Sequence, residues 1–233
     1  MEGTRLKLEK LLDQCSSALV DHADLKVTQA QAFPLVLEGM FELDSPKGPV
    51  DAYQIRVEIP ETFPFASPRV FETGGRIPWE IDRHVFSDGR ACLEVWPVWR
   101  AKNPDANVRT VLNGPVRNFL LSQSVFEATK EWPFGDYAHG SAGQREALRS
   151  VLGAPTPEDR DLLWRLHALL SPPRRQNACP CNSGRLYRKC HADEMRKIAD
   201  SMDEAGLWLM TEMYLGILER SKEAVATATE PLN

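Results

Sequence analysis

The sequence predicts an α+β fold, because a helical pattern at the start of the chain is followed by alternating strand patterns and then by further helices. Residues 5–20 carry apolar side chains at helical spacing. Residues 33–43 and 50–59 instead alternate between apolar and polar side chains, and a cluster of turn-forming residues at 44–49 separates them. These segments predict an antiparallel strand–turn–strand meander, followed by a third strand at 69–72.

The remaining segments predict loops and helices. Residues 73–101 are rich in Gly, Pro and Trp and predict a long loop without a helix. A helix is expected at 108–121, where Pro115 interrupts the pattern. Further helices are expected at about 156–170 and 192–221.

This pattern divides the chain into a large first domain and several smaller parts. The expected parts are a domain at 1–153, a helix and linker at 154–173, a metal-binding motif at 174–193, a C-terminal helix at 194–222 and a disordered tail at 223–233.

Composition and charge argue against two classes of partner. The net charge of −5 provides no general attraction for nucleic acids or anionic membranes. No apolar run approaches the roughly 20 residues that cross a bilayer, and the charged N-terminus lacks the apolar centre of a signal peptide. A cytoplasmic protein without nucleic-acid or membrane partners is therefore expected.

The five cysteines favour a metal site and a free thiol over a disulfide framework, because the count is odd and three of them lie within twelve residues. Cys15 lies on the apolar stripe of the first helix and is expected in the core. Cys92 follows the tight-turn dipeptide Asp88-Gly89, where it is either a nucleophile or a half-buried structural thiol.

The segments around Cys92 resemble the ubiquitin-conjugating enzyme family over about residues 5–125. The matching pieces, in the family's order and spacing, are Phe63-Pro64-Phe65 with Pro68, Asp88-Gly89, Cys92-Leu93, Trp99 and Thr110-Val111-Leu112. The resemblance implies an N-terminal helix, a four-stranded antiparallel meander, C-terminal helices and a thioester on Cys92.

Two histidines are further candidates for the site that the resemblance implies. The family carries His-Pro-Asn before the cysteine, whereas this chain has His84 at the asparagine position, a pattern similar to that of bacterial relatives, including those encoded in antiviral defence operons. His84 is either a catalytic hydrogen-bond donor or a residue that holds the loop. His139 lies in a glycine-rich segment, 132–143, expected to be an irregular loop. It either lines the thioester site or satisfies loop carbonyls.

The resemblance implies an enzyme that takes a ubiquitin-like protein, or another protein with an activated C-terminus, from an activating enzyme on another chain and passes it to an amine. In some bacterial defence operons the relatives act on a cyclic-nucleotide synthase, which is thus a candidate partner. Two other functions stay open. One is a non-enzymatic binding scaffold. The other is an adaptor whose cysteine-rich segment at 179–191 and C-terminal apolar residues Trp208, Met210, Met213 and Tyr214 bind a partner.

The segment at 179–191 predicts a zinc site. It holds Cys179 and Cys181 one residue apart, then Cys190 next to His191. Three thiolates and an imidazole complete a tetrahedral shell, which is typical of a structural zinc ion. The segment resembles the zinc motif at the C-terminus of the SecA translocation ATPase, with Asn182 where glycine is common. The nearby basic residues 185–189 either dock on an acidic surface or are solvated.

Overall fold

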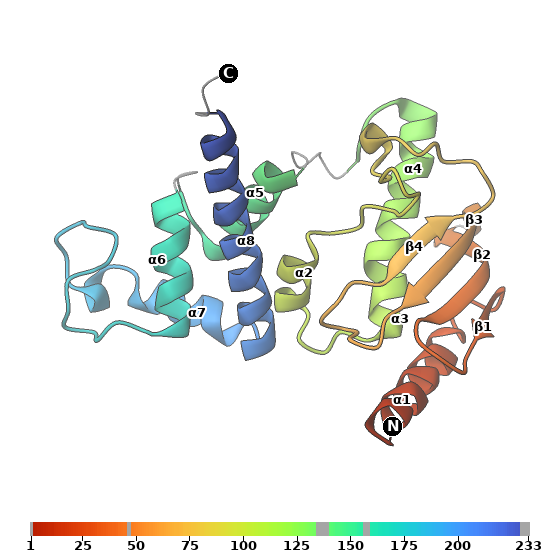
Figure 1. Ribbon diagram of the computed structural model, residues 1–233, viewed down its shortest axis with the longest axis horizontal. Helices are drawn as coiled ribbons and strands as arrows, with labels where there is room; N and C mark the ends of the chain where they lie inside the picture. Colours follow the sequence, from red (N-terminus) through yellow and green to blue (C-terminus); the bar gives the residue numbers. More distant parts are fainter. Residues whose placement is uncertain (1, 46–47, 134–139, 156–158, 229–233) are drawn as a thin grey trace. The chain divides into compact units, whose positions relative to one another are not determined.

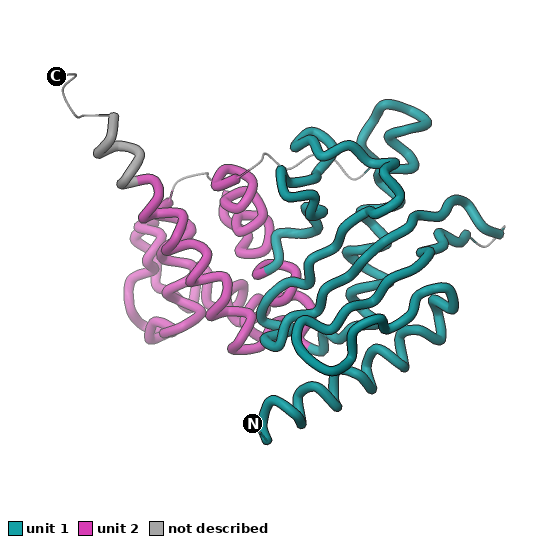
Figure 2. The backbone as a smooth tube through the Cα atoms, turned by 45° about the vertical axis from the view of Figure 1, so that its right-hand side comes forward, with its two compact units in different colours: residues 1–96, 105–136 teal, residues 97–104, 137–233 magenta. Residues whose placement is uncertain are grey.

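The structure is a computed structural model that describes residues 2–45, 48–133, 140–155 and 159–228, with side chains described as far as Ser221. The chain forms two compact units (Figure 2). The first unit comprises residues 1–96 and 105–136, and the second comprises residues 97–104 and 137–233. The division differs from the expected domain boundary at 153, because residues 97–104 and the helix after residue 139 belong to the second unit.

The first unit contains a four-stranded antiparallel sheet in the order β1-β2-β3-β4 (Figure 1). The strands are β1 (Leu25–Gln29), β2 (Leu35–Ser45), β3 (Gly48–Ile59) and β4 (Arg69–Glu72). The predicted α+β class and the antiparallel meander are confirmed. The strands expected from alternation at 33–43 and 50–59 did not include β1, a short strand of five residues of which only Leu25 is buried.

One face of the sheet forms the core of this unit. Leu37 pairs with Val57 and Phe41 with Tyr53 across β2 and β3, and all four side chains are buried. Helix α1 (Glu2–Ala18) begins the unit, and Figure 1 shows α4 (Arg117–Thr129) crossing one face of the sheet. Cys15 is fully buried in α1, which confirms its prediction as a core residue.

The helix predicted at 108–121 is present but changes its geometry at Pro115. It consists of α3 (Val108–Val111), a π-helical turn η2 (Leu112–Val116) and α4. In a regular α-helix the ring of Pro115 would clash with the carbonyl of Val111, and the proline has no N–H to donate. A wider π turn at this place keeps the chain helical on both sides of the proline.

The second unit is helical. Its helices are α2 (Trp96–Lys102), α5 (Gly140–Leu152), α6 (Asp159–Leu170), α7 (Ala192–Asp200) and α8 (Glu204–Ala228), with the short 3₁₀ turn η3 (Tyr187–Lys189). Within the ranges that the structure describes, no helix combines the length and apolar character needed to cross a membrane.

Two expected loops are partly helical. The 3₁₀ turn η1 (Ile81–Arg83) and all but the last residue of helix α2 lie inside the predicted loop 73–101, so the expectation that this segment has no helix is wrong. Pro97 lies in the first turn of α2, where its missing N–H is not needed. The first residues of α5 occupy the end of the segment 132–143, which was expected to be irregular throughout.

The single helix predicted at 192–221 is two helices separated at residues 201–203. Asp203 caps α8, since its Oδ1 atom accepts the N–H of Gly206 at 2.8 Å. Arg100 of α2 donates to both carboxylate oxygens of Asp203, at 3.2 and 2.7 Å. A Cβ atom on Gly206 would lie 2.5 Å from the Cα atom of Ala101, so glycine permits a close approach of α8 to α2.

Candidate functional site

The turn before Cys92 has the geometry that Asp88-Gly89 predicts. The N–H of Gly89 donates to the Phe86 carbonyl at 2.9 Å, and the N–H of Phe86 donates to the Arg90 carbonyl at 2.8 Å. Gly89 has φ +83°, and a Cβ atom there would lie 2.7 Å from the indole of Trp79. Both the backbone angle and the packing of Trp79 therefore require glycine at this turn.

The backbone of Cys92 is held on two sides. The N–H of Ala91 donates to the Val70 carbonyl of β4 at 2.7 Å, which ties the segment to the sheet. The N–H of Cys92 donates to the His84 carbonyl at 2.6 Å. Val85 and Ala91 form an isolated antiparallel bridge between these two points. Main-chain hydrogen bonds from Ala91 and Cys92 thus hold the backbone that carries the thiol.

Cys92 is half-buried and lines a cleft of about 630 Å³ within the first unit. The proline-rich segment that follows β3 contributes Pro60 and Pro68 to the same cleft, and Trp96 lines it after the cysteine. Trp96 donates its indole N–H to the Pro64 carbonyl at 3.1 Å. The two segments that carry the family resemblance therefore lie together around one thiol.

Burial raises the pKa of the Cys92 thiol, and the negative charge of Glu94 raises it further. The side chain is therefore predominantly protonated at neutral pH. Its environment differs from that of a cysteine protease, where a neighbouring histidinium lowers the thiol pKa.

His84 meets Cys92 through its backbone. It ends η1 in the left-handed region, with φ 53° and ψ 38°, where Asn, Asp and His are enriched among non-glycine residues. This preference gives a physical reason why histidine is tolerated at this position. The imidazole ring packs edge-on against the ring of Trp132, with the two ring centroids 4.8 Å apart. His139, the other candidate histidine, lies outside the described residues.

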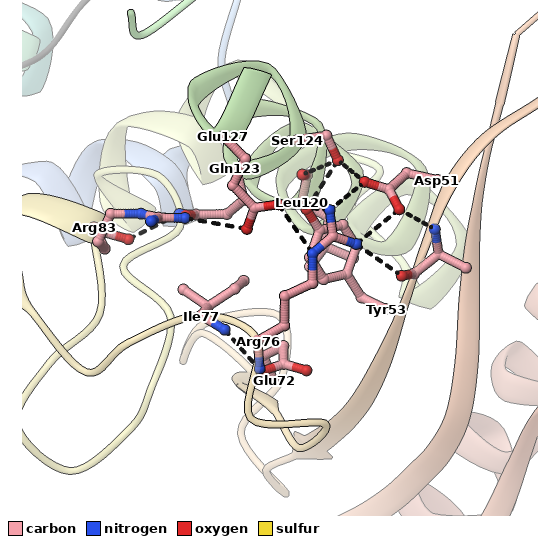
Figure 3. Close-up of polar contacts among 11 residues, drawn as sticks. Asp51, Tyr53, Glu72, Arg76, Ile77, Arg83, Leu120, Gln123, Ser124 and Glu127 are labelled. Carbon is pink, nitrogen blue, oxygen red and sulfur yellow. Dashed lines mark hydrogen bonds and ion pairs between the residues drawn. The ribbon is translucent and has the colours of Figure 1, made fainter. Parts of the chain in front are cut away.

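A polar network joins α4 to the segment that precedes His84 (Figure 3). Arg83 donates to Gln123 Oε1 from Nε at 3.0 Å and from Nη2 at 2.7 Å. Gln123 Nε2 donates back to the Arg83 carbonyl at 2.8 Å. Glu127 links this pair to Arg76, which also forms two 2.7 Å bonds with the carboxylate of Asp51.

Sequence reasoning did not identify this network. The available signal was Gln123 itself, a polar residue at helical spacing from Phe119 and Leu120 but two residues beyond the end of the helix predicted at 108–121. A polar side chain in a core-facing position needs hydrogen-bond partners, but the sequence does not show which residues supply them.

In the second unit, the structure brings Cys179, Cys181, Cys190 and His191 together, with one ligand atom of each within 4.8 Å of the others. The Nδ1 atom of His191 lies 3.2 Å from the sulfurs of Cys179 and Cys190. The sulfurs of Cys181 and Cys190 are 3.6 Å apart. Bonds of about 2.3 Å to sulfur and 2.0–2.1 Å to nitrogen place the ligands of tetrahedral zinc roughly 3.5 Å from one another. The donor set and its spacing are compatible with zinc.

The turn between the paired ligands has the predicted backbone. Asn182 has φ 60° and Gly184 has φ 71°, so asparagine adopts the left-handed conformation at the position where glycine is common. The N–H of Cys179 donates to the Arg185 carbonyl at 2.8 Å, which closes the turn. Ser183 Oγ lies 3.2 Å from the Cys181 sulfur and 3.4 Å from the Cys190 sulfur.

A second layer of side chains supports His191. Its Nε2 atom faces Glu194 Oε2 at 3.7 Å. Arg165 of α6 is buried and donates to Glu194 Oε1 at 2.7 Å and to the Leu152 carbonyl at 2.8 Å. Such outer partners orient a metal-binding imidazole and fix which nitrogen faces the metal.

Comparisons with known proteins agree with this part of the chain. A family model described as the SEC-C motif matches residues 177–193, a range that includes all four donor residues. No curated protein and no solved structure matches the chain.

Proposed function

We propose that the first unit carries the activated C-terminus of a ubiquitin-like protein, or of another protein, as a thioester on Cys92 and transfers it to an amine. The observation that carries this proposal is the placement of Cys92. Its thiol is half-buried beside a cleft, its N–H is bound by the His84 carbonyl, and the proline-rich segment after the meander lines the same cleft. This arrangement agrees with the role that the resemblance to ubiquitin-conjugating enzymes implies.

The proposed reaction has two steps. The Cys92 sulfur attacks the carbonyl carbon of a thioester on an activating enzyme, one C–S bond forms and one breaks, and the thiol proton ends on the departing thiol. An amine then attacks the new thioester, an amide forms and the Cys92 thiol is regenerated. The raised pKa of Cys92 lowers the fraction of thiolate at neutral pH, although each thiolate that forms is more nucleophilic. Since little thiolate is present at neutral pH, the fixed position of the sulfur must supply much of the rate.

Intact-mass analysis tests the proposal. The chain is incubated with ATP, candidate activating enzymes and ubiquitin-like proteins, and then with or without a reducing thiol. We expect an adduct of the partner's mass that a thiol removes, a thiol-resistant oxyester or no adduct with Cys92→Ser, and no adduct with Cys92→Ala. Cys15→Ala is the matched control, because Cys15 is a core thiol, and this variant should still form the adduct. An adduct that persists unchanged in Cys92→Ala would refute the assignment.

A binding scaffold is the second candidate for the first unit. The raised pKa of Cys92 favours it, since nothing in that shift activates the thiol for attack. As a scaffold, the first unit would bind a protein segment in the cleft without forming a covalent bond. Binding of a candidate protein partner that Cys92→Ala leaves unchanged, together with no adduct, would support the scaffold.

For the second unit we propose that Cys179, Cys181, Cys190 and His191 hold a structural zinc ion. The four donors would complete a tetrahedral shell, and the ion would link the turn to helix α7, which begins directly after His191. Elemental analysis should find one zinc per chain, and a strong chelator should lower the melting temperature. A fully folded, metal-free chain whose melting temperature does not respond to added zinc would rule out this role.

The adaptor alternative requires the C-terminal apolar residues to be accessible. Met210 and Tyr214 are buried, and the Tyr214 hydroxyl donates to the Asp159 carbonyl at 2.7 Å. Trp208 is about half exposed (51%). Of the four residues considered for a partner surface, Met210 and Tyr214 are therefore part of the core, which leaves Trp208 and the half-buried Met213.

A further inference from the structure

We infer that Gln123 is a positioning residue for Cys92 and acts through the main chain of Arg83 and His84. Gln123 is fully buried on α4. The inference rests on the proposed function for its catalytic meaning, but its structural consequence at Cys92 is measurable without any partner protein.

Gln123 forms three hydrogen bonds with Arg83. The amide group of Gln123 accepts two N–H bonds from the Arg83 guanidinium and donates one to the Arg83 carbonyl. One side chain thus binds both ends of the same residue, as Figure 3 shows. The Arg83 guanidinium also lies over the ring of Phe126, 4.9 Å from its centroid. The orientation of residue 83 is therefore set by α4.

The main chain that follows Arg83 contacts Cys92. His84 follows Arg83 directly, and its carbonyl accepts the N–H of Cys92 at 2.6 Å. Its left-handed backbone conformation is uncommon for a residue with a side chain, and such conformations persist where neighbouring bonds hold them. The N–H of His84 donates to the Ile81 carbonyl at 2.9 Å, and Gln123 adds a bond to the Arg83 carbonyl immediately before His84. Loss of the Gln123 amide should therefore loosen the carbonyl that holds Cys92.

Substitution of Arg76 distinguishes a positioning role of Gln123 from a general contribution of the network to stability. Arg76 belongs to the same network, since it binds Glu127, which in turn lies 3.4 Å from Arg83 Nη2. The bonds of the Arg76 side chain itself go to Glu127, Asp51 and the Ala52 carbonyl, so Arg76 is linked to residue 83 through Glu127. Arg76→Met and Gln123→Met both remove polar bonds of the network and keep an unbranched side chain. Gln123→Met loses bonds to Arg83, next to His84, whereas Arg76→Met loses bonds to Asp51 and Glu127.

The test compares the Cys92 amide and thiol in these variants. In folded Gln123→Met we expect hydrogen exchange of the Cys92 amide to accelerate at least tenfold and the pH profile of Cys92 alkylation by iodoacetamide to shift to lower pH, since loosening exposes the thiol. In Arg76→Met both readouts should stay within twofold of the wild type. Folded Gln123→Met with wild-type exchange and alkylation would overturn the inference.

A second variant covers the case in which Gln123→Met does not fold. Gln123→Glu keeps an oxygen for the Arg83 guanidinium but replaces the donor to the Arg83 carbonyl with a carboxylate oxygen that repels this carbonyl, so we expect a change in the same direction. An unchanged Cys92 amide in Gln123→Glu would also overturn the inference. Because neither readout needs a cargo, a change at Cys92 without any wild-type thioester would refute the proposed function and leave the positioning role of Gln123 intact.

Discussion

The carbonyl of His84 accepts the backbone N–H of Cys92 at 2.6 Å, and this bond joins the two residues that the family resemblance places at the centre of the site. The imidazole of His84 meets Trp132. The bond between His84 and Cys92 is thus made by the main chain, and it depends on a left-handed backbone at His84 more than on the imidazole.

Two substitutions at position 84 distinguish the contribution of the left-handed backbone from that of the imidazole ring. Both His84→Asn and His84→Val remove the imidazole, but only valine is strained at φ 53°. We expect His84→Asn to change the free energy of unfolding little and His84→Val to lower it by about 1–3 kcal/mol, as measured by urea denaturation. If the two variants are equally stable, the backbone of residue 84 does not constrain this loop.

The charge of Glu94 should be measurable at Cys92. Glu94→Gln removes a contribution that raises the Cys92 pKa, so alkylation at a fixed pH should become faster. Because Glu94 is exposed, we expect an increase of roughly twofold at low salt, fading near 1 M salt where charges are screened within about 3 Å. Glu131→Gln, another exposed carboxylate of the first unit, serves as the control. A salt-independent increase would point to a change of structure instead of charge.

Asp51 should contribute to stability in a pH-dependent way. Its hydrogen bonds with Arg76 hold the Asp51 pKa well below its usual range, against the opposing effect of burial, and Ser124 adds a further bond. A depressed pKa in the folded state means that this contribution is complete above about pH 4 and is lost as the pH falls towards the folded-state value.

Asp51→Asn should therefore lower stability near pH 7 and make the loss of stability below pH 4 less steep, as followed by thermal melts across pH. Asp13→Asn, which removes an exposed carboxylate from α1, should leave the acid limb unchanged. If the melting temperatures of Asp51→Asn and the wild type fall equally steeply below pH 4, the Asp51–Arg76 pair does not control stability in acid.

Glu194 should tune metal binding by the second unit. Its carboxylate faces the His191 nitrogen that is directed away from the sulfurs, and Arg165 holds it there. We expect Glu194→Gln to weaken zinc binding by about 10- to 100-fold in a chelator competition. Asp193→Asn, a change at the neighbouring exposed acid, should bind zinc as the wild type does. Equal affinities in both variants would mean that Glu194 does not support the imidazole.

Local patterns predicted most elements of the first unit, because a half-buried strand and an amphipathic helix repeat with periods that a sequence displays directly. The strand at 69–72 and the core position of Cys15 follow from such patterns. Helix α2 and the break before α8 did not, since a tertiary contact accompanies each: Asp203 caps α8 while bound to Arg100 of α2. Propensity alone favoured a loop in the first case and a continuous helix in the second.

By itself, the sequence determined the α+β class, the Asp88-Gly89 turn before Cys92 and the four metal donors, because each depends on residues that are close in the chain or on a strict spacing. Only the tertiary structure decided how Cys92 is held. Gln123 lies 40 residues from Arg83 in the sequence, and their hydrogen bonds exist because α4 packs beside the segment that precedes His84. A buried amide needs hydrogen-bond partners, but residues distant in the sequence supply them, so only the folded chain shows which residues they are.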